Sequence, residues 1–336
     1  MKNILPYLDP NFFRGQFILS AENYPAPKGW ANYKYLDWNL YTADLPVIDV
    51  YNEEKIWMGW CIGHPIVDGI LEPETIIITK SDNEQDPFED FYNRTSGKWI
   101  LILLSIEEEK IYISPLGSLS IVYSLIEKTL ASTPTLIGLD SDWDNNLMTE
   151  LNFPEKLEWL PFGLTFKKNV RRLMPNHTLN LKEWKVTRHW PTPETDLSML
   201  NDTSFAVQQI VKNVTTSINA ITDKHQICLT LTAGRDSRSV LACSRKEINK
   251  TLVVTFAPEK ETVEMNIAKR IAKKNNLNHQ FLKIPKATPE EKQSWLYLTG
   301  FSGSGAICKI HKVIEKLDPN MVLIPGTSAE LHKGNY

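Results

Sequence analysis

The second part of the chain alternates stretches of strand length with stretches of helical period, and this alternation constrains the fold more than any other feature. Residues 204–221 carry apolar side chains at spacings of three and four, which predicts an amphipathic helix with Asp202 or Thr203 as its N-cap. Beyond it we predict strands at 226–232, 251–256, 280–284 and 321–325, and helices at 237–245, 262–275 and 288–299. Strands that alternate with helices indicate a parallel, doubly wound α/β sheet.

The first part of the chain has a different pattern. Residues 1–190 hold short apolar runs of strand length, such as 99–104, 110–113 and 120–124, which turn residues separate. This pattern predicts a mainly β domain with a few helices. Two prolines followed by Ser, Thr and Asp over 191–203 suit a linker. A length of 336 residues also favours two domains, and we place them at 1–190 and 204–336.

Charge and hydropathy exclude several classes of function. The chain has 37 Lys and Arg against 40 Asp and Glu, so its net charge is −3. A chain this close to neutrality has no overall attraction for nucleic acid or an anionic membrane, and any anion must be held by a local site. No apolar run reaches the roughly 18 residues of a membrane span, and the N-terminus lacks the apolar segment of a secretory signal. We therefore expect a soluble, cytoplasmic protein with neither nucleic-acid nor membrane partners.

The cysteines and histidines show no spacing typical of a metal site. The four cysteines are widely separated, and the seven histidines include neither His-x-x-x-His nor His-Glu-x-x-His. The spacing therefore favours reduced, mostly buried thiols in the four cysteines, Cys61, Cys228, Cys243 and Cys308. Cys61 and His64 are close in sequence, but no third group is evident that would orient them for nucleophilic catalysis.

The loop Leu231-Thr-Ala-Gly-Arg-Asp-Ser-Arg-Ser239 joins the first predicted strand to the next helix. Ligands of doubly wound sheets bind at loops of this kind, beyond the carboxyl ends of the strands. Its composition suits a phosphate. Gly234 lets the backbone approach closely, Thr232 and Ser237 supply hydroxyl groups, and the N–H groups of a helix start attract an anion. Arg235 and Arg238 add cations that can pair with phosphate oxygens.

Asp236 stands out in this loop because a carboxylate repels a phosphate unless a cation lies between them. Mg²⁺ favours one or two carboxylates together with substrate phosphates, so the pattern predicts an Mg²⁺ ligand. The alternative is that Asp236 only caps the helix. The loop lacks the Gly-x-x-x-x-Gly-Lys pattern of a Walker A motif.

Thr232-Ala-Gly-Arg-Asp-Ser-Arg238 resembles the Ser-Gly-Gly-x-Asp-Ser pyrophosphate loop of the asparagine synthetase-like family, which includes asparagine synthetase, β-lactam synthetase and the lasso-peptide cyclases. Further stretches resemble the family in its order. Strand 251–256 is followed by a helix and by Asn276-Leu-Asn-His279, and Gly326-Thr-Ser-Ala-Glu-Leu-His-Lys-Gly-Asn-Tyr336 is similar to Gly-x-Gly-x-Asp-Glu-x-x-Gly-Gly-Tyr. The likeness is good over 160–336 and faint over 50–125.

The resemblance implies a fold and a chemistry. The fold is an Ntn-hydrolase-like, glutaminase-type β-sandwich domain followed by an ATP-pyrophosphatase (PP-loop) domain. The chemistry is a ligase reaction, in which ATP activates a carboxylate as its acyl-adenylate and a nitrogen nucleophile then displaces AMP. The implied partners are ATP, Mg²⁺ and a carboxylate-bearing small molecule or peptide.

The site residues follow by position in the family motifs. Thr232, Gly234, Ser237 and Arg238 would hold the pyrophosphate, Leu231 and Val254 would line the adenine and ribose pocket through their backbones, and Gly326 would pack against the nucleotide. Asp236 and Glu330 would be the catalytic, metal-binding acids, since either type of carboxylate is a hard oxygen ligand.

Several positions depart from the family pattern. Ala233 and Ser328 replace glycines, and Ala233 restricts φ where a glycine has freedom. The glutamine-dependent members begin Met-Cys, whereas Met1 is followed here by Lys2, so we expect no glutaminase activity and a nitrogen from ammonia or a substrate amine. Family domains continue past the Gly-Asn-Tyr motif, so the resemblance implies a second domain that is cut short.

Two other functions stay open. One is another PP-loop adenylating enzyme, such as an RNA-modifying one, for which a basic face or a cysteine pair would be expected. The other is a non-catalytic binding or scaffold protein of the same fold, which the residues Ala233 and Ser328 suggest.

Overall fold

The structure of the protein is a computed structural model that describes residues 12–79, 87–105, 108–138, 143–154, 160–191, 202–246, 248–303, 308–314 and 316–326. Contacts divide the chain into two compact units: Met1–Val67 with Glu72–Thr195 and Thr288–Ala306, and Asp68–Leu71 with Asp196–Ala287 and Ile307–Tyr336. Among the described helices, none has the length and hydropathy that spanning a membrane requires.

The elements of the first unit are β1 (Phe17–Ser20), β2 (Ala31–Tyr35), β3 (Trp38–Thr42), β4 (Val47–Asn52), β5 (Trp57–Val67), β7 (Thr75–Ile78), α1 (Pro87–Arg94), β8 (Thr95–Leu104), β9 (Glu109–Ile113), β10 (Val122–Ser124), β11 (Thr129–Ala131), α2 (Asn145–Glu150), β12 (Val170–Arg172), β13 (His177–Asn180), β14 (Lys185–Arg188) and α6 (Pro289–Leu298). Those of the second unit are β6 (Ile70–Leu71), α3 (Thr203–Thr222), β15 (Gln226–Thr230), α4 (Arg235–Cys243), β16 (Leu252–Ala257), α5 (Val263–Lys274), β17 (His279–Lys283), α7 (Cys308–Ile314) and β18 (Met321–Ile324).

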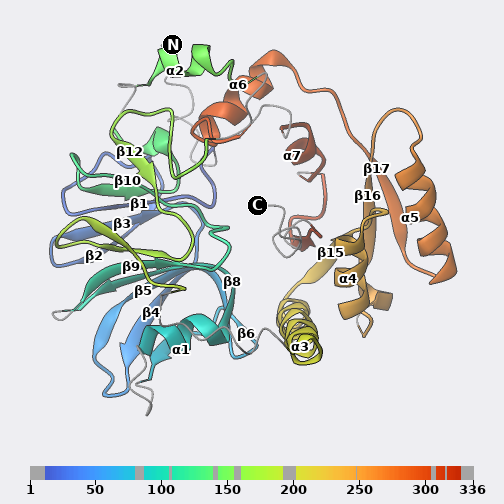
Figure 1. Ribbon diagram of the computed structural model, residues 1–336, viewed down its shortest axis with the longest axis horizontal. Coiled ribbons are helices and arrows are strands. Elements are labelled where there is room, and N and C mark those ends of the chain that lie inside the picture. The colour runs from blue at the N-terminus through green and yellow to red at the C-terminus, as the bar shows by residue number, and fades with distance from the viewer. Residues whose placement is uncertain are drawn as a thin grey trace. The chain divides into compact units, whose positions relative to one another are not determined.

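Two sheets stack on each other in the first unit (Figure 1). One has the strand order β12-β10-β11-β1-β3-β2, and the other has the order β14-β13-β9-β8-β5-β4-β7. Alternate side chains of one strand point to opposite faces of its sheet. In β8, Ile100, Ile102 and Leu104 therefore join the core between the two sheets, where they meet Phe17 and Leu19 of β1.

Helices cover the outer faces of both sheets. The other side chains of β8, Trp99, Leu101 and Leu103, pack against Phe88 and Phe91 of α1. On the outer face of the six-stranded sheet, the alternate side chains of β1 and β3 form a cluster with Tyr297 and Leu298 of α6. The first unit thus has four layers, in the order helix, sheet, sheet, helix.

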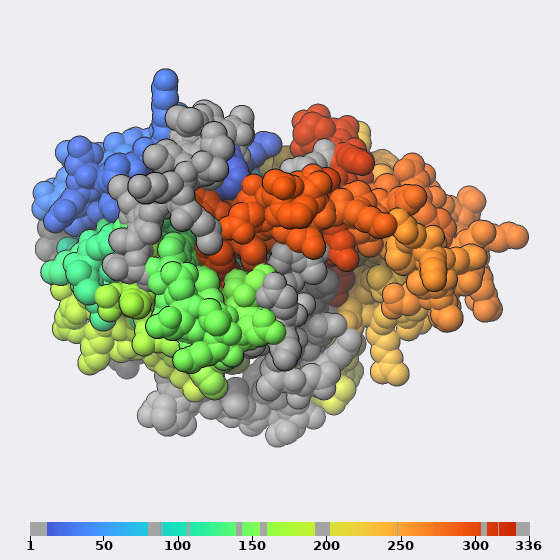
Figure 2. All heavy atoms as spheres, turned by 90° about the horizontal axis from the view of Figure 1, so that it is seen from above, coloured from blue at the N-terminus to red at the C-terminus, as the bar shows by residue number. Residues whose placement is uncertain are grey.

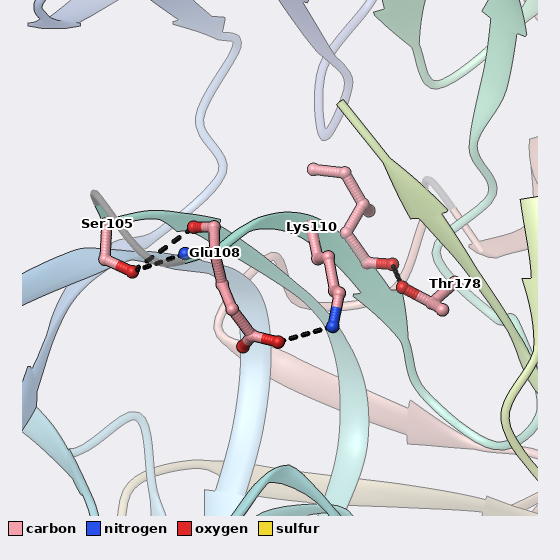
Figure 3. A network of polar contacts seen from close by, with 5 residues as sticks. Ser105, Glu108, Lys110 and Thr178 are labelled. Atoms are coloured by element: carbon pink, nitrogen blue, oxygen red, sulfur yellow. Dashed lines mark hydrogen bonds and ion pairs between the residues drawn. The ribbon is translucent and has the colours of Figure 1, made fainter. Parts of the chain in front are cut away.

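Polar contacts join the end of β8 to the start of β9, and join β9 to β13 (Figure 3). The Ser105 hydroxyl donates to the Glu108 carbonyl oxygen and accepts from the Glu108 N–H, at 3.3 and 3.1 Å, and the Glu108 carboxylate pairs with Lys110. The Thr178 hydroxyl of β13 donates to the carbonyl oxygen of Ile111 at 2.8 Å. These bonds hold β13 and the strand pair β8–β9 in register.

The helix α6 packs with the first unit, whereas the sequence analysis counted residues 288–299 with the second domain. The Thr135 hydroxyl donates to the carbonyl oxygen of Tyr297 at 2.6 Å, and the Gln16 amide donates to that of Leu298 at 3.1 Å. Periodicity predicts a helix but not its packing partner, so the sequence could not show this. The expected linker lies almost entirely outside the described residues.

The second unit is built on a parallel sheet with the strand order β17-β16-β15-β18. Val253 of β16 packs against Ala268 and Ala272 of α5, while Ile227 and Leu229 of β15 pack against Ile218 of α3. Leu241 of α4 belongs to both clusters, so α4 lies between α3 and α5 on one face of the sheet. Figure 1 shows these helices beside the strands.

The positions of the predicted elements are confirmed within a few residues. The helix expected at 204–221 is α3, whose first turn is capped by Asp202, which accepts a hydrogen bond from the Phe205 N–H at 3.0 Å. The strands and helices expected between 226 and 325 are β15, α4, β16, α5, β17, α6 and β18. The mainly β character of the first part and the parallel sheet of the second are also confirmed.

Candidate functional site

The strand order places a topological switch point between β15 and β18. The chain runs from β15 to β16 and β17 on one side, and β18 pairs with the other side of β15. Connections that leave neighbouring parallel strands in opposite directions leave a crevice beyond their carboxyl ends, where ligands bind. The loop that begins at Leu231 follows β15, and Gly326 follows β18 by two residues. Both segments that the sequence singled out therefore meet at the switch point.

Hydroxyl groups organise the loop after β15. Ser237, which is only 4% exposed, lies with its Oγ 3.0 Å from Oγ1 of Thr232 and accepts a hydrogen bond from the Thr232 N–H at 3.1 Å. Thr232 Oγ1 accepts in turn from the Gly234 N–H at 3.1 Å. The structure thus brings together three of the four residues that were predicted to hold a pyrophosphate, namely Thr232, Gly234 and Ser237. Two backbone N–H groups of the loop, those of Thr232 and Gly234, are bonded to its own hydroxyls.

Gly326 lies against the backbone of the first turn of α4. A Cβ added to Gly326 would be 2.6 Å from both Cα and N of Ser237, a distance that side chains do not tolerate. The Gly326 N–H donates to Thr230 Oγ1 at 3.2 Å, and this bond joins residues that are 96 positions apart in the chain. The absence of a side chain at Gly326 is therefore what allows β18 to end beside the loop.

The first turn of α4 offers backbone donors at the same place. Gly234 is the N-cap of α4, and as a glycine it has no side chain that could cap the helix. Helix N-termini carry a partial positive charge of about half a unit and bind anions. Asp236 lies in this first turn and is half-buried. Gly234 adopts an ordinary φ of −65°, so unusual backbone geometry does not require a glycine here.

Ala233 causes no backbone strain. It is not among the described residues that have a positive φ, and it is half-buried beside Thr232. The sequence analysis expected a restriction here because an alanine replaces a family glycine. In this chain the loop takes a path that alanine accepts.

Leu231 and Val254 lie side by side, and both side chains are fully buried. The Leu231 N–H donates to the Val254 carbonyl oxygen at 2.8 Å, and the Leu231 carbonyl oxygen accepts from the Thr255 hydroxyl at 2.7 Å. Any contact of these two residues with a ligand would therefore come from backbone atoms that already have one partner.

A relay of hydrogen bonds crosses three strands to reach the loop. Thr255 Oγ1 of β16 lies 2.9 Å from Nε2 of His279 on β17. The single hydroxyl proton of Thr255 is committed to the Leu231 carbonyl, which can only accept, so Nε2 of His279 must carry a proton and donate. Burial lowers the pKa of His279, which favours the neutral form of the ring, and the bond to Thr255 places the single proton of that form on Nε2. The relay anchors the first residue of the loop.

Arg238 bonds to the backbone of the N-cap residue of α4. Its Nε donates to the carbonyl oxygen of Gly234 at 3.1 Å, and its side chain lines a groove between α4 and α5. An i to i−4 bond of this kind holds the guanidinium beside the helix. Glu330, the second predicted metal ligand, and Ser328 lie outside the described residues. Among the residues that are described, no group of three or more His, Cys, Asp or Glu side chains is placed to hold a metal ion.

The described cysteines are free thiols, and Cys61 is not placed as a nucleophile. Its side chain is fully buried in the core beneath α1, and burial raises the pKa of its thiol. His64 is exposed, and its Nδ1 lies 2.6 Å from Oε1 of Glu72. Positions 61 and 64 of β5 point to opposite faces of the sheet, so the pair suggested by their sequence spacing does not form.

Sequence reasoning missed the roles of Thr230 and Thr255. Both threonines stand in strands where β-branched residues are expected for packing alone, so their hydroxyl groups carried no separate signal. His279 was noted only as a family position. A comparison of the sequence with protein-family models finds no match, and a comparison with curated proteins finds none either.

Proposed function

We propose that the chain is an ATP-dependent amide-forming ligase that adenylates a carboxylate and transfers the acyl group to a nitrogen nucleophile. The observation that carries the proposal is the meeting of the Thr232–Ser237 hydroxyl loop, the N-terminus of α4 and the bare backbone of Gly326 at one switch point. The resemblance to the asparagine synthetase-like family supports the same reading. The two stacked, mainly antiparallel sheets of the first unit agree with the β-sandwich domain that the resemblance implies.

The residues at the switch point suit a nucleoside triphosphate. Hydroxyl groups of Thr232 and Ser237 and the N–H groups of the first turn of α4 would donate toward phosphate oxygens, and Gly326 lets the end of β18 lie directly against this loop. Asp236 would hold Mg²⁺ together with phosphate oxygens, an arrangement this ion favours. The metal neutralises charge on the phosphates when bound.

The reaction balances in two displacements. A carboxylate oxygen of the substrate attacks the α-phosphorus of ATP, and the bond to pyrophosphate breaks. An amine nitrogen then attacks the acyl carbon, AMP leaves with the shared oxygen, and the nitrogen loses a proton. The donors of the loop contribute by meeting the negative charge that grows on the leaving pyrophosphate.

The nitrogen is proposed to come from ammonia or from an amine on the substrate. Cys61, Cys228 and Cys308 are buried, and burial raises the pKa of Cys228 to about 11, so these thiols are poor nucleophiles. Release of glutamate from glutamine by the protein would contradict this part of the proposal.

The test is Mg²⁺-dependent binding of ATP, followed by exchange of labelled pyrophosphate into ATP with a panel of carboxylic acids. We expect Asp236→Asn to weaken Mg²⁺-ATP binding and to abolish exchange. Asp223→Asn, which changes an exposed acid beyond the C-terminus of α3, is the matched control and should behave as wild type. Binding without exchange would favour a non-catalytic homologue, and the absence of Mg²⁺-dependent nucleotide binding would overturn the proposal.

A further inference from the structure

A groove with a volume of 650 Å³ lies between α4 and α5 of the second unit. Its walls combine two apolar side chains with four basic ones: Ile267, Ile271, Arg238, Arg270, Lys273 and Lys274. The two isoleucines stand one helical turn apart on α5 and are half-buried, whereas all four basic residues are exposed. Side chains of the orange segment that contains α5 reach the surface in Figure 2.

The basic residues of this groove are not neutralised within the described part of the chain. No ion pair joins any of the four to a carboxylate there. Arg270 and Lys274 stand at positions i and i+4, where like charges destabilise a helix by about 0.2–0.5 kcal/mol. An anion that entered the groove would relieve this repulsion.

Favourable interactions with the helix dipole explain the positions of only some of these basic residues. Lys273 and Lys274 are in the last turn of α5, where the helix dipole favours cations. Arg270 lies further from that end. Arg238 lies near the N-terminus of α4, where the dipole disfavours a cation. The two arginines therefore need another explanation.

We propose that the groove between α4 and α5 is a docking site for an acidic, amphipathic segment of a partner protein. Carboxylates of such a segment would pair with the two arginines and the lysines, and its apolar side chains would cover Ile267 and Ile271. The stretch from Ile267 to Lys274 spans about 10 Å of helix, which matches two turns of a partner helix. The proposal rests mainly on the groove residues of α5, which lie outside the loop and take no part in the proposed ligase reaction.

The composition of the groove favours a peptide over a nucleic acid. Single-stranded nucleic acids are held by aromatic side chains on which bases stack, and none lines this groove. An apolar floor with a basic rim instead matches the alternation of apolar and acidic faces on an amphipathic helix. An acidic amphipathic helix would thus match the charge of the groove and would also bury its two apolar side chains.

The test uses the whole chain and a fluorescein-labelled helical peptide of about 14 residues, or four turns, with Leu at positions i, i+3, i+4 and i+7 and Glu on both flanks. Binding is measured by fluorescence anisotropy. We expect Arg270→Glu to weaken binding by about tenfold or more. Lys269→Glu makes the same kind of charge reversal one position away, outside the groove, and should leave the affinity within about twofold.

Two further arms make the outcome decisive. A peptide with Lys in place of Glu should bind Arg270→Glu better than wild type, and Ile267→Ser should weaken binding of the acidic peptide. Equal effects of Arg270→Glu and Lys269→Glu, or equal binding of a scrambled peptide of the same composition, would overturn the docking site. If a single-stranded oligonucleotide bound more tightly than the acidic peptide, and Arg270→Glu abolished that binding, the groove would be assigned to nucleic acid. This result would also overturn the proposed peptide docking site. Circular dichroism confirms that each variant is folded.

Discussion

Gly326 and Ser237 lie very close to each other at the switch point. Ser237 can occupy its position only because residue 326 has no side chain. Ser237 is buried and bonded to Thr232, so it cannot move without breaking the loop. Gly326 brings the end of β18 to within a few ångströms of the Ser237 backbone. At the scale of single residues, the geometry of the candidate site therefore depends on a steric limit as well as on hydrogen-bonding groups.

Replacing Gly326 by Ala should shift the loop and weaken Mg²⁺-ATP binding. The new Cβ would meet Cα and N of Ser237 at 2.6 Å, and relief of such overpacking typically costs about 1–3 kcal/mol of stability. Urea denaturation and calorimetric titration with Mg²⁺-ATP measure the two effects. Gly303→Ala is the control, because a Cβ at Gly303 has no heavy atom within 4 Å. Equal effects of the two substitutions would show that the contact at Gly326 is unimportant.

The three neighbouring strands β15, β16 and β17 act together through the relay from His279 to Thr255 to the Leu231 carbonyl. Ladder hydrogen bonds alone would hold the strands in register. The relay also holds the backbone of Leu231, the residue that follows β15 and begins the loop, in a fixed position. At the scale of elements, the sheet thus determines where the loop leaves it.

Removing the hydroxyl of Thr255 should destabilise the second unit. Thr255→Val keeps the shape of the side chain but leaves the Leu231 carbonyl and the His279 N–H without this partner, at a cost of about 1–3 kcal/mol. Thr255→Ser keeps the hydroxyl and should lose less. Urea denaturation compares the two variants, and a Ser variant as unstable as the Val variant would argue against the relay.

The same relay predicts a pH dependence. Burial lowers the pKa of His279 below its value in the unfolded chain, which is about 6.5. The neutral ring therefore stabilises the fold fully above about pH 6.5, and this contribution is lost as the pH falls through the folded pKa. His279→Gln keeps an N–H donor without titrating, so its free energy of unfolding should fall less than that of wild type on acidification. Denaturation curves at several pH values measure the difference, and parallel curves would refute the prediction.

The molecule as a whole consists of two units, and three separate segments of the chain belong to the first one. Residues 288–306 pack with the strands of the first unit, after the chain has already formed most of the second. Gly300 follows α6 with a φ of +60°, and a Cβ there would be 2.4 Å from Cδ of Pro134. The return of the chain to the first unit thus depends on a close contact between distant segments.

Replacing Gly300 by Ala should therefore loosen the first unit and leave the second intact. The substitution combines an unfavourable φ with a clash, so we expect about 2 kcal/mol or more of destabilisation. Hydrogen exchange read by mass spectrometry should show lost protection in β1 and β11, with β15 and β16 unchanged. The same control, Gly303→Ala, should leave all four strands protected. Loss confined to β15 and β16 would contradict the assignment of residues 288–306.

The sequence by itself determined the positions of the elements and the composition of the loop. Apolar periodicity is local, so α3 and α5 could be located from spacing, and the turn between β15 and α4 could be recognised from Gly234 and its hydroxyl neighbours. Only the tertiary structure decided which groups meet. Close packing in the folded chain brings distant segments together at three places: the contact of Gly326 with Ser237, the hydrogen bonds of Thr255 and the packing of α6. It also selects the side-chain conformation of Arg238. No local pattern encodes such contacts, because their energy arises only when distant residues are brought together.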